Sequence, residues 1–402
     1  MWLKTTHLVF AALLLLAPTG WTSGFSEFPV YQGPGFQLHP VVSGELVVWN
    51  DYRDGYWDIY GKYLSEPNDL AITTSRESSV GGIDGGFLVW SDSRDGKADV
   101  YGKHLPSGPE VAICLAPSPQ GPADISGAYV VWKDGRNSPT NVPPEFWNND
   151  IYGYELQTGS EIPICTNPAD QINPRIDGNI VVWQDGRNRF FPPFTEWDIY
   201  GYDLSTEQEF PVTNAPWAQA EPAISGNVVV WMDVRNDNWD IYGKDLSTGI
   251  EFPICRDPFG QGQPSIDGNI VVWVDYRNTT PEGWGQGDIY GYDLLTHTEF
   301  PISLDPSDQG PPQISGNLVV WHVRRNGDRD IYGAYIPEPA STSLLALAAL
   351  PLLRRKRRSG CTREGVAEIS KQSHLRLHLV DSCDVQGTAV VLSLGREVRI
   401  DR

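Results

Sequence analysis

Short apolar runs recur along the chain, and each of them ends at a tryptophan. Residues 180–183, IVVW, are continuously apolar and rich in β-branched side chains, which is typical of an inner strand that is covered on both faces. The phrase WDIYGYDL at residues 197–204 alternates instead, so that every second side chain lies on the same face. Both patterns predict β-strands.

The same pair of phrases returns seven times. The seven aligned tryptophans are Trp49, Trp90, Trp132, Trp183, Trp231, Trp273 and Trp321. Their spacing of roughly 41 to 51 residues is that of a propeller blade. Each unit also has a lead-in such as QINPRIDG and a later EFPV-like segment, and Ser-Gly-Asn or Asp-Gly-Asn provides a tight hairpin turn. Each unit therefore predicts a blade of four strands.

The two ends of the repeat region complete one another. The last unit stops after residues 332–335 and lacks a fourth strand, while residues 27–30, EFPV, stand alone before the first unit. A linear stack of such units would leave two open edges. We therefore predict an all-β, seven-bladed β-propeller of four-stranded blades over residues 25–336, with the ring closed by the N-terminal strand.

A glycine recurs inside the third strand of every unit, as at Gly201. Glycine weakens a strand because it has no side chain to pack. We expect that a neighbouring sheet approaches closely at these positions.

The repeat also resembles a known family. The order of Gln, Pro, a Ser/Asp-Gly turn, an apolar strand, Asp-x-Arg and Asp-Ile-Tyr is similar to the TolB-type β-propeller repeat over residues 27–336. The units differ in their shorter turns, and seven units replace the six of TolB itself. The resemblance implies a protein-interaction platform, although propellers of similar repeat type also belong to peptidases and lyases.

The first 24 residues predict export. They contain one lysine, an apolar run at 8–17 and then small residues, which is the order of a secretory signal peptide. We expect mature protein to begin near Phe25, outside the cytoplasm.

Residues 337–358 resemble a PEP-CTERM sorting signal: Pro-Glu-Pro, an apolar stretch, then the basic run 354–358. The resemblance implies a Gram-negative bacterium, a sorting protease of the exosortase type, transient membrane contact through residues 340–358, and a cell-surface or extracellular location. A buried helix is the alternative for the apolar stretch. The tail 359–402 is a readthrough extension or a small appended element, in which Cys361 and Cys383 could pair if oxidised.

Charge narrows the partners. The formal net charge is −21, and the basic run at 354–358 lies outside the repeats. So acidic a repeat region repels the phosphate backbone of nucleic acids, and this excludes nucleic acid as a partner. Five cysteines are too few for a disulfide scaffold. Cys114, Cys165 and Cys255 occupy one slot in three blades and are expected to be buried free thiols.

The most repeated polar feature is Asp-x-Arg after the tryptophan. Side chains two residues apart on a strand lie on the same face. We therefore expect structural ion pairs between the Asp and Arg of each motif, or between the Arg and the Asp of the next Asp-Ile-Tyr. A catalytic site is needed once, whereas this feature repeats around the ring. The pairs are Asp51/Arg53, Asp92/Arg94, Asp134/Arg136, Asp185/Arg187, Asp233/Arg235 and Asp275/Arg277; in the last unit Val323 replaces the aspartate and Arg325 remains.

No cofactor is expected. The acid density leaves calcium open, but no Asp-x-Asp-x-Asp-Gly loop occurs and the repeated arginine competes with a metal. The few histidines are scattered, which disfavours zinc. Neither a Gly-x-Ser-x-Gly elbow nor a P-loop is present, although hydrolysis by a pair of carboxylates stays open.

The least repetitive segments are three insertions between the arginine and the Asp-Ile-Tyr, in units three, four and six. They occupy one loop position and therefore one face of the ring. Exposed aromatic side chains there would suit stacking on sugar rings or anchoring a protein, while folding back over the blade edges is the structural alternative. The candidate ligand-binding aromatics are Phe146, Trp147, Phe190, Phe191, Phe194 and Trp284.

These features predict an exported, cell-surface, non-enzymatic binding platform for a protein or an extracellular polysaccharide. The alternative is a secreted carbohydrate-active or peptide-cleaving enzyme that uses acidic residues on the channel-mouth face. A glutamine at the start of most lead-ins faces that mouth, or hydrogen-bonds a turn.

Overall fold

The computed structural model describes residues 25–139, 148–188, 196–279, 286–325, 327–337, 365–368 and 376–379. The predicted signal peptide, the apolar stretch before the basic run, and the six candidate aromatics Phe146, Trp147, Phe190, Phe191, Phe194 and Trp284 lie outside the described residues.

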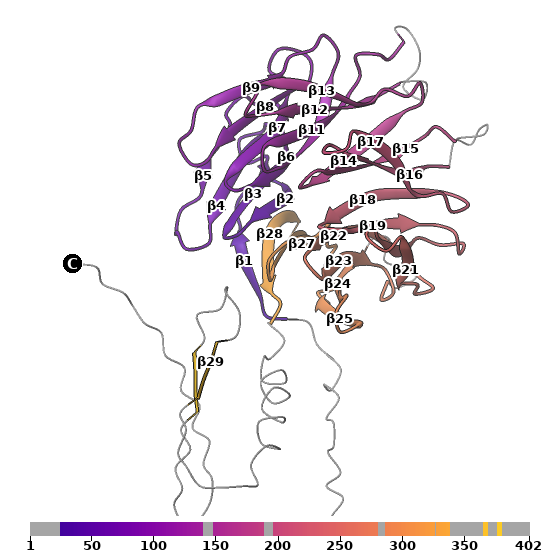
Figure 1. Ribbon diagram of the computed structural model, residues 1–402. Helices are drawn as coiled ribbons and strands as arrows, with labels where there is room; N and C mark the ends of the chain where they lie inside the picture. Colours follow the sequence, from indigo (N-terminus) through magenta and orange to yellow (C-terminus); the bar gives the residue numbers. More distant parts are fainter. Residues whose placement is uncertain are drawn as a thin grey trace, which may run out of the picture. The chain divides into compact units, whose positions relative to one another are not determined.

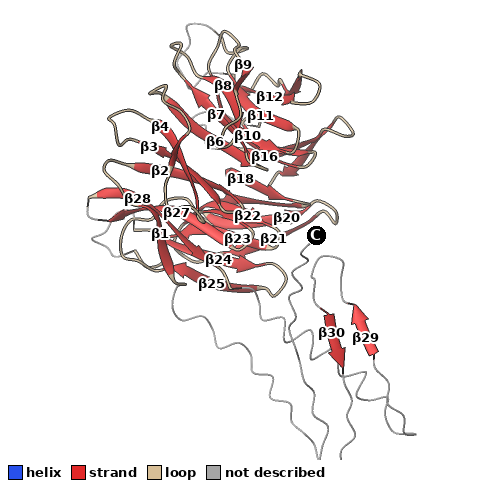
Figure 2. Ribbon diagram, turned by 90° about the vertical axis from the view of Figure 1, so that its left-hand side faces the viewer, coloured by secondary structure: helices blue, strands red, loops and turns tan. Residues whose placement is uncertain are grey.

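Seven four-stranded antiparallel sheets form the propeller (Figures 1 and 2). The innermost strands are β2 (Gln37–Ser43), β6 (Ser78–Asp84), β10 (Gln120–Ser126), β14 (Gln171–Asp177), β18 (Gln219–Ser225), β22 (Gln261–Asp267) and β26 (Gln313–Ser315). The second strands are β3 (Leu46–Asp51), β7 (Phe87–Asp92), β11 (Tyr129–Asp134), β15 (Ile180–Asp185), β19 (Val228–Asp233), β23 (Ile270–Asp275) and β27 (Leu318–Arg325).

The third strands are β4 (Asp58–Tyr63), β8 (Asp99–His104), β12 (Asp150–Glu155), β16 (Asp198–Asp203), β20 (Asp240–Asp245), β24 (Asp288–Asp293) and β28 (Asp328–Tyr335). The outer strands are β5 (Leu70–Ala71), β9 (Glu110–Cys114), β13 (Ser160–Cys165), β17 (Gln208–Thr213), β21 (Ile250–Cys255), β25 (Thr298–Ser303) and β1 (Glu27–Tyr31). The predicted fold class, an all-β propeller of seven four-stranded blades, is confirmed.

The ring closes as predicted. The seventh sheet has the order β1-β28-β27-β26, and in Figure 1 the indigo β1 lies beside the orange β28. Glu27 pairs with Ala334 and Phe28 with Gly333 across this junction. Val30 is only 2 % exposed. The first strand of the chain is therefore the outer strand of the last blade.

The hydrophobic core lies between the blades. Each of the seven buried clusters combines side chains from two adjacent sheets; one joins Val131 and Ile151 of blade 3 to Val181 and Trp183 of blade 4. The seven aligned tryptophans are all 0 % exposed. A blade buries its apolar faces only against its neighbours, so the ring is the stable unit.

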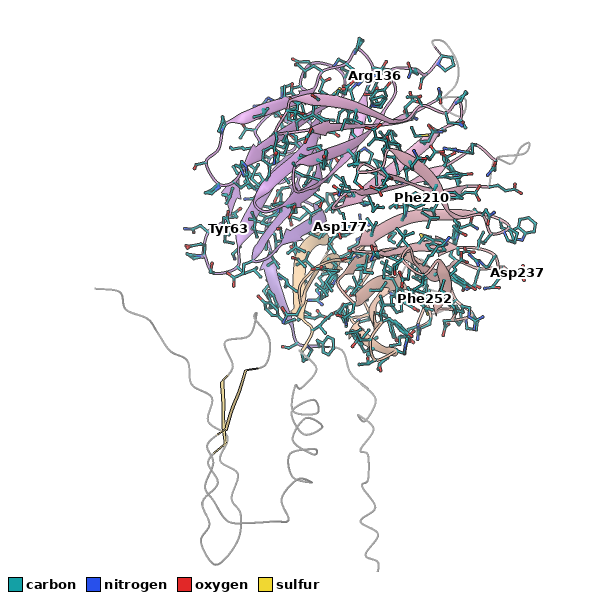
Figure 3. The ribbon with its side chains drawn as sticks, in the orientation of Figure 1. Tyr63, Arg136, Asp177, Phe210, Asp237 and Phe252 are labelled. Atoms are coloured by element: carbon teal, nitrogen blue, oxygen red, sulfur yellow. The ribbon has the colours of Figure 1, made fainter. Side chains whose placement is uncertain are left out.

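The recurring third-strand glycine has another cause than the one expected from the sequence. The nearest atoms to a Cβ on Gly201 would be Phe210 Cζ at 2.7 Å, and Phe210 is its cross-strand partner in the same blade. Gly291 and Phe300 repeat the arrangement. At Gly61 and Gly153 the nearest atom belongs instead to an isoleucine of the same blade, Ile72 or Ile164. The glycine is therefore covered by its own blade, and the expectation of a neighbouring sheet was wrong. Figure 3 shows Phe210 and Phe252 on adjacent blades.

The innermost strands share an irregularity that positions the site described below. In β2, β6, β10, β14, β18 and β22 the pairing with the second strand shifts register near the third residue, as between Ile172 and Arg175. At that third residue His39, Asn173, Glu221 and Gln263 have φ between 50° and 54°. Non-glycine residues in this left-handed region cost on the order of 1–2 kcal/mol each.

The residues after Pro337 form a second unit, which is distinguished from the propeller by its own internal contacts. Its described residues form one hairpin, in which β29 (Gly365–Glu368) pairs antiparallel with β30 (Arg376–Leu379). Within the described ranges of the whole chain, no helix has the length and apolarity to cross a membrane.

Candidate functional site

The Asp-x-Arg motifs lie inside the blades, where each makes a closed network. Asp185 accepts hydrogen bonds from Trp183 Nε1 at 2.8 Å and from Arg187, whose Nη2 lies 2.8 Å away. Arg187 also pairs with Glu209 of the outer strand at 2.5 Å and lies 3.9 Å from the Tyr200 ring centroid. The six aspartate–arginine distances are 2.5 to 2.8 Å. The motif thus fastens three strands of its own blade.

In blade 7 the arginine has different partners. Because Val323 replaces the aspartate, the buried Trp321 Nε1 has no hydrogen-bond partner among the residues that the structure describes. Arg325 pairs with Glu27 at 2.5 Å and with Asp305 at 2.7 Å. Glu27 belongs to β1, so this arginine links the last repeat to the first strand.

In blades 3 to 6 the aspartate of Asp-Ile-Tyr accepts a hydrogen bond from the asparagine that follows the arginine. Asn137 Nδ2 donates to Asp150 Oδ2 at 2.6 Å, and Asn188 Nδ2 donates to Asp198 Oδ2 at 2.7 Å. The sequence-based alternative, that the arginine binds this aspartate, is not what the structure shows. Burial raises the pKa of Asp150 to about 6, against the opposing hydrogen bond from Asn137.

We predict that Asp150→Asn changes the pH dependence of stability. The folded-state pKa of Asp150 lies above its ordinary value, so the folded protein takes up this proton first, and its stability rises as pH falls through about 6. Urea unfolding between pH 4 and 7 should show the variant's gain over the native chain at pH 7, shrinking towards pH 4. The exposed Asp237→Asn is the control; equal profiles for the two variants would contradict the prediction.

Glutamines that begin the innermost strands serve the lead-in turns. Gln171 Nε2 donates to Ala169 O at 2.7 Å, and Gln219 Nε2 donates to Trp217 O at 3.0 Å. Five such glutamines are the first residues of β2, β10, β14, β18 and β22, and Gln309 holds the equivalent position ahead of β26. All six side chains are buried, and their Oε1 atoms have no hydrogen-bond partner among the described residues. They brace the turns rather than face a ligand.

Cys114, Cys165 and Cys255 are buried free thiols. Burial raises the pKa of Cys114 to about 11 and that of Cys165 to about 12. Arg187 Nη2 lies 3.3 Å from Cys165 Sγ, so this slot belongs to the arginine network. Such thiols are inert at neutral pH.

A cavity of about 960 Å³ lies at the mouth of the axial channel, on the face where the innermost strands begin. Its lining comes from the start of the inner strand or lead-in of all seven blades, and from the β3–β4 connection of blade 1. This volume lies at the upper end of the range that ligand sites occupy. The cavity is therefore large enough to hold a ligand.

One wall of the cavity is aromatic. Tyr52, Tyr56 and Trp57 lie in the β3–β4 connection, with the rings of Tyr52 and Trp57 5.0 Å apart. The guanidinium of Arg76 lies 4.7 Å from the Tyr56 ring centroid. Tyr56 is 48 % exposed, so its ring is open to a ligand.

The opposite wall is polar. Asn173, Glu221 and Gln263 project from the strained third position of three successive blades, and Asn173 Nδ2 donates to Glu221 Oε1 at 3.0 Å. Strain at positions that also line a cavity is typical of a functional site. Amide and carboxylate groups here provide both donors and acceptors.

Within the described residues, the lining of the cavity reaches the fifth inner-strand position, at Val41 and Arg175. Asp124 holds the equivalent position in blade 3, where its carboxylate lies against Gly82. Burial raises the pKa of Asp124, and Arg175 opposes that shift. Of the described residues, those of the turns at the far end of the inner strands do not line the cavity.

At that far end, side chains join the blades to one another. The last inner-strand residue alternates between Ser and Asp along the chain, and at six of the seven blade junctions in the described ring it accepts a hydrogen bond from the next blade's turn glycine. Asp177 accepts from Gly226 N at 2.5 Å and Ser225 from Gly268 N at 3.0 Å. Asp177 appears among the inner strands in Figure 3. These bonds hold the inner strands at fixed spacing below the cavity.

The cavity residues were not singled out from the sequence, although a signal exists. The third inner-strand position is occupied by His39, Val80, Pro122, Asn173, Glu221 and Gln263, and the equivalent residue ahead of β26 is Pro311. The architectural positions repeat, whereas this one differs between most blades. Across the described ranges, no group of three or more His, Cys, Asp or Glu side chains could hold a metal ion.

Comparisons with known proteins identify the fold alone. No family model and no curated protein matches the sequence. An oligogalacturonate lyase from Vibrio parahaemolyticus is 12 % identical, with 78 % of this chain and 94 % of that one covered and a TM-score of 0.59. The β-propeller domain of the Trilobed protease from Pyrococcus furiosus is 13 % identical, with 75 % and 95 % covered and a TM-score of 0.55.

A putative TolB from Agrobacterium tumefaciens is 16 % identical, with 67 % of this chain and 95 % of that one covered and a TM-score of 0.44. The domain of the Trilobed protease is described as having an open velcro topology. Here, by contrast, β1 pairs with β28.

Proposed function

We propose that the chain is a non-enzymatic binding module whose cavity at the channel mouth takes the end of a polysaccharide chain. The observation that supports this most strongly is the cavity's division into an aromatic wall, with Tyr52, Tyr56 and Trp57, and a polar wall, with Asn173 and Glu221. A sugar ring presents apolar C–H faces and a rim of hydroxyls. It can stack on the first wall while its hydroxyls exchange hydrogen bonds with the second.

The shape of the site favours a glycan over a folded protein. Stable protein–protein interfaces bury at least about 1,200 Å² over broad surfaces. A concave cavity of about 960 Å³ is instead filled by a slender ligand. A protein partner that inserts a peptide segment would occupy the same cavity. The binding screen below distinguishes such a partner from a glycan.

The same proposal places the protein outside the cytoplasm, at the cell surface of a Gram-negative bacterium. Its support is the sequence: the apolar run at 8–17, and Pro-Glu-Pro, an apolar stretch and a basic run at 337–358. Processing by a signal peptidase and by an exosortase-type protease follows from it.

The test is binding of the full chain to a glycan array, followed by titration calorimetry with the best glycan. Replacing Tyr52 and Tyr56 together with Ala should weaken binding at least about tenfold, because truncation of an aromatic anchor typically costs 1 kcal/mol or more. Leu295→Ala is the control, since Leu295 is 77 % exposed in the β24–β25 turn at the opposite end of the blade.

Unchanged affinity in the tyrosine variant would remove the ligand from the cavity. Release of a shortened or unsaturated product from a bound glycan would favour the enzymatic alternative, in which carboxylates such as Glu221 act on the ligand. Loss of that product in Glu221→Gln, with binding retained, would then assign the chemistry.

A further inference from the structure

Two exposed aromatic side chains occupy one turn position on adjacent blades. Trp217 and Phe259 each stand two residues before the glutamine that begins an inner strand, and they are 62 % and 52 % exposed. Most other blades have a small residue there: Gly35, Ser118, Ala169 and Ser307. Since those turns form without a large side chain, the architecture of the blade does not require the two aromatic rings.

The turns that present these rings are firmly held. Gln219 Nε2 donates to Trp217 O at 3.0 Å. Asn238 Nδ2 donates to Phe259 O at 2.9 Å and to Asp257 O at 2.8 Å. A rigid turn that projects an aromatic ring into solvent loses little conformational entropy when a ligand covers the ring.

Trp217 also has a strained backbone. Its φ is 70°, in the left-handed region that a bulky side chain rarely adopts, and the equivalent Gly35 has a φ of 82°. Glycine would suit this turn better than tryptophan. The indole is thus retained at a cost in stability, which is a pattern associated with binding positions.

Both turns lie at the rim of the cavity. Glu221 and Gln263, four residues after Trp217 and Phe259, line the cavity on the same blades. Arg76 occupies the equivalent turn position on blade 2 and itself lines the cavity. A molecule that leaves the polar wall therefore meets this rim.

We propose that Trp217 and Phe259 form a second contact for the same glycan chain, outside the cavity. This rests on the proposed function. The described residues that line the cavity all come from one end of the channel, so a chain that is bound there by its end extends across the same face. The two rings then stack on sugar units beyond the cavity, and the site prefers a polymer to a short oligosaccharide.

The net charge of the protein favours a neutral glycan as the ligand. The formal net charge of −21 repels a polymer that carries a carboxylate or sulfate on every unit. Stacking on aromatic rings and hydrogen bonding to amides need no charge on the ligand. The proposed ligand class is accordingly a neutral polysaccharide.

The experiment compares polymers with their trisaccharides on the full chain by titration calorimetry. The probes are β-1,3-glucan, β-1,4-xylan and β-1,4-mannan, with alginate as the anionic contrast. The variant combines Trp217→Gly and Phe259→Ser, which copies the residues of blades 1 and 7. Leu295→Ala is again the control on an exposed apolar residue.

The native chain should bind one neutral polymer at least about tenfold more tightly, per binding chain end, than its trisaccharide. The double variant should lose this difference and keep its trisaccharide affinity. Its melting temperature should stay equal or rise, because glycine relieves the strain at Trp217. The bound polymer, but not the trisaccharide, should protect native tryptophan emission from acrylamide quenching, and this protection should disappear in the double variant.

The outcomes separate the two proposals. A double variant that keeps its preference for the polymer overturns the second contact and leaves the cavity site standing. Tightest binding to alginate overturns the neutral class. Binding to none of the polymers or trisaccharides overturns the proposed function, and the second contact with it.

Discussion

A chain that lacks residues 26–30 should be less stable by on the order of 4 kcal/mol, measured by urea unfolding. The deletion removes β1, so β28 becomes an unpaired edge, Gly333 loses the Phe28 ring that lies 3.1 Å from its Cβ position, and Arg325 loses Glu27. Val30, at 2 % exposed, leaves a hole in the cluster shared with Val47 and Trp49.

A transplant separates the loss of this strand from the loss of chain length. Moving residues 26–31 to a position after Tyr335, through a Ser-Thr-Gly turn like that of residues 247–249, gives blade 7 the connection that the other blades have. The transplanted chain should recover most of the lost stability. A deletion variant with native stability would show that β1 does not close the ring.

Asp185→Ala should cost about 3–5 kcal/mol, again by urea unfolding. The carboxylate is fully buried and accepts from Trp183 Nε1 and Arg187. Its removal leaves a buried indole N–H without an acceptor and a half-paired guanidinium, and breaking a buried charge network is costly for that reason.

Blade 7 offers the matched comparison, because Val323 stands at the equivalent position. Val323→Asp supplies an acceptor to Trp321 Nε1 and a partner to Arg325, whose present partners are Glu27 and Asp305. We expect a change within about 1 kcal/mol of the native stability, in either direction. A loss as large as that of Asp185→Ala would mean that packing at this position, rather than charge pairing, sets the cost.

The strands and the ring were predictable because each depends on a pattern that repeats. Seven copies of the apolar run ending in tryptophan define seven second strands, and the unattached EFPV of residues 27–30 supplies the one missing outer strand. The cavity was not predictable in the same way. His39 lies more than a hundred residues before Asn173 and Glu221. Only the closed ring brings these equivalent positions together at the mouth of the channel.

Individual side-chain contacts within a blade were also not predictable from the sequence, for physical reasons. The partner of Gly201 is an aromatic ring one strand away in the same sheet, which depends on pairing register. The choice between Arg187 and Asn188 as the partner of Asp198 depends on reach: the arginine is already held by Asp185 and Glu209, and the shorter asparagine lies beside the aspartate. Composition alone does not distinguish these partners.

The pairing of β1 with β28 sets the order in which the molecule can be completed. Glu27 and Ala334 are register partners, yet about three hundred residues of chain separate them. Because a ribosome synthesises the chain from its N-terminus, β1 has no partner strand until the last repeat has been made. Such a distant pairing makes folding slow. Blades 1 to 6 can be assembled from consecutive residues, but blade 7 joins the first and last strands of the propeller, so a product that ends before the last repeat remains an open arc.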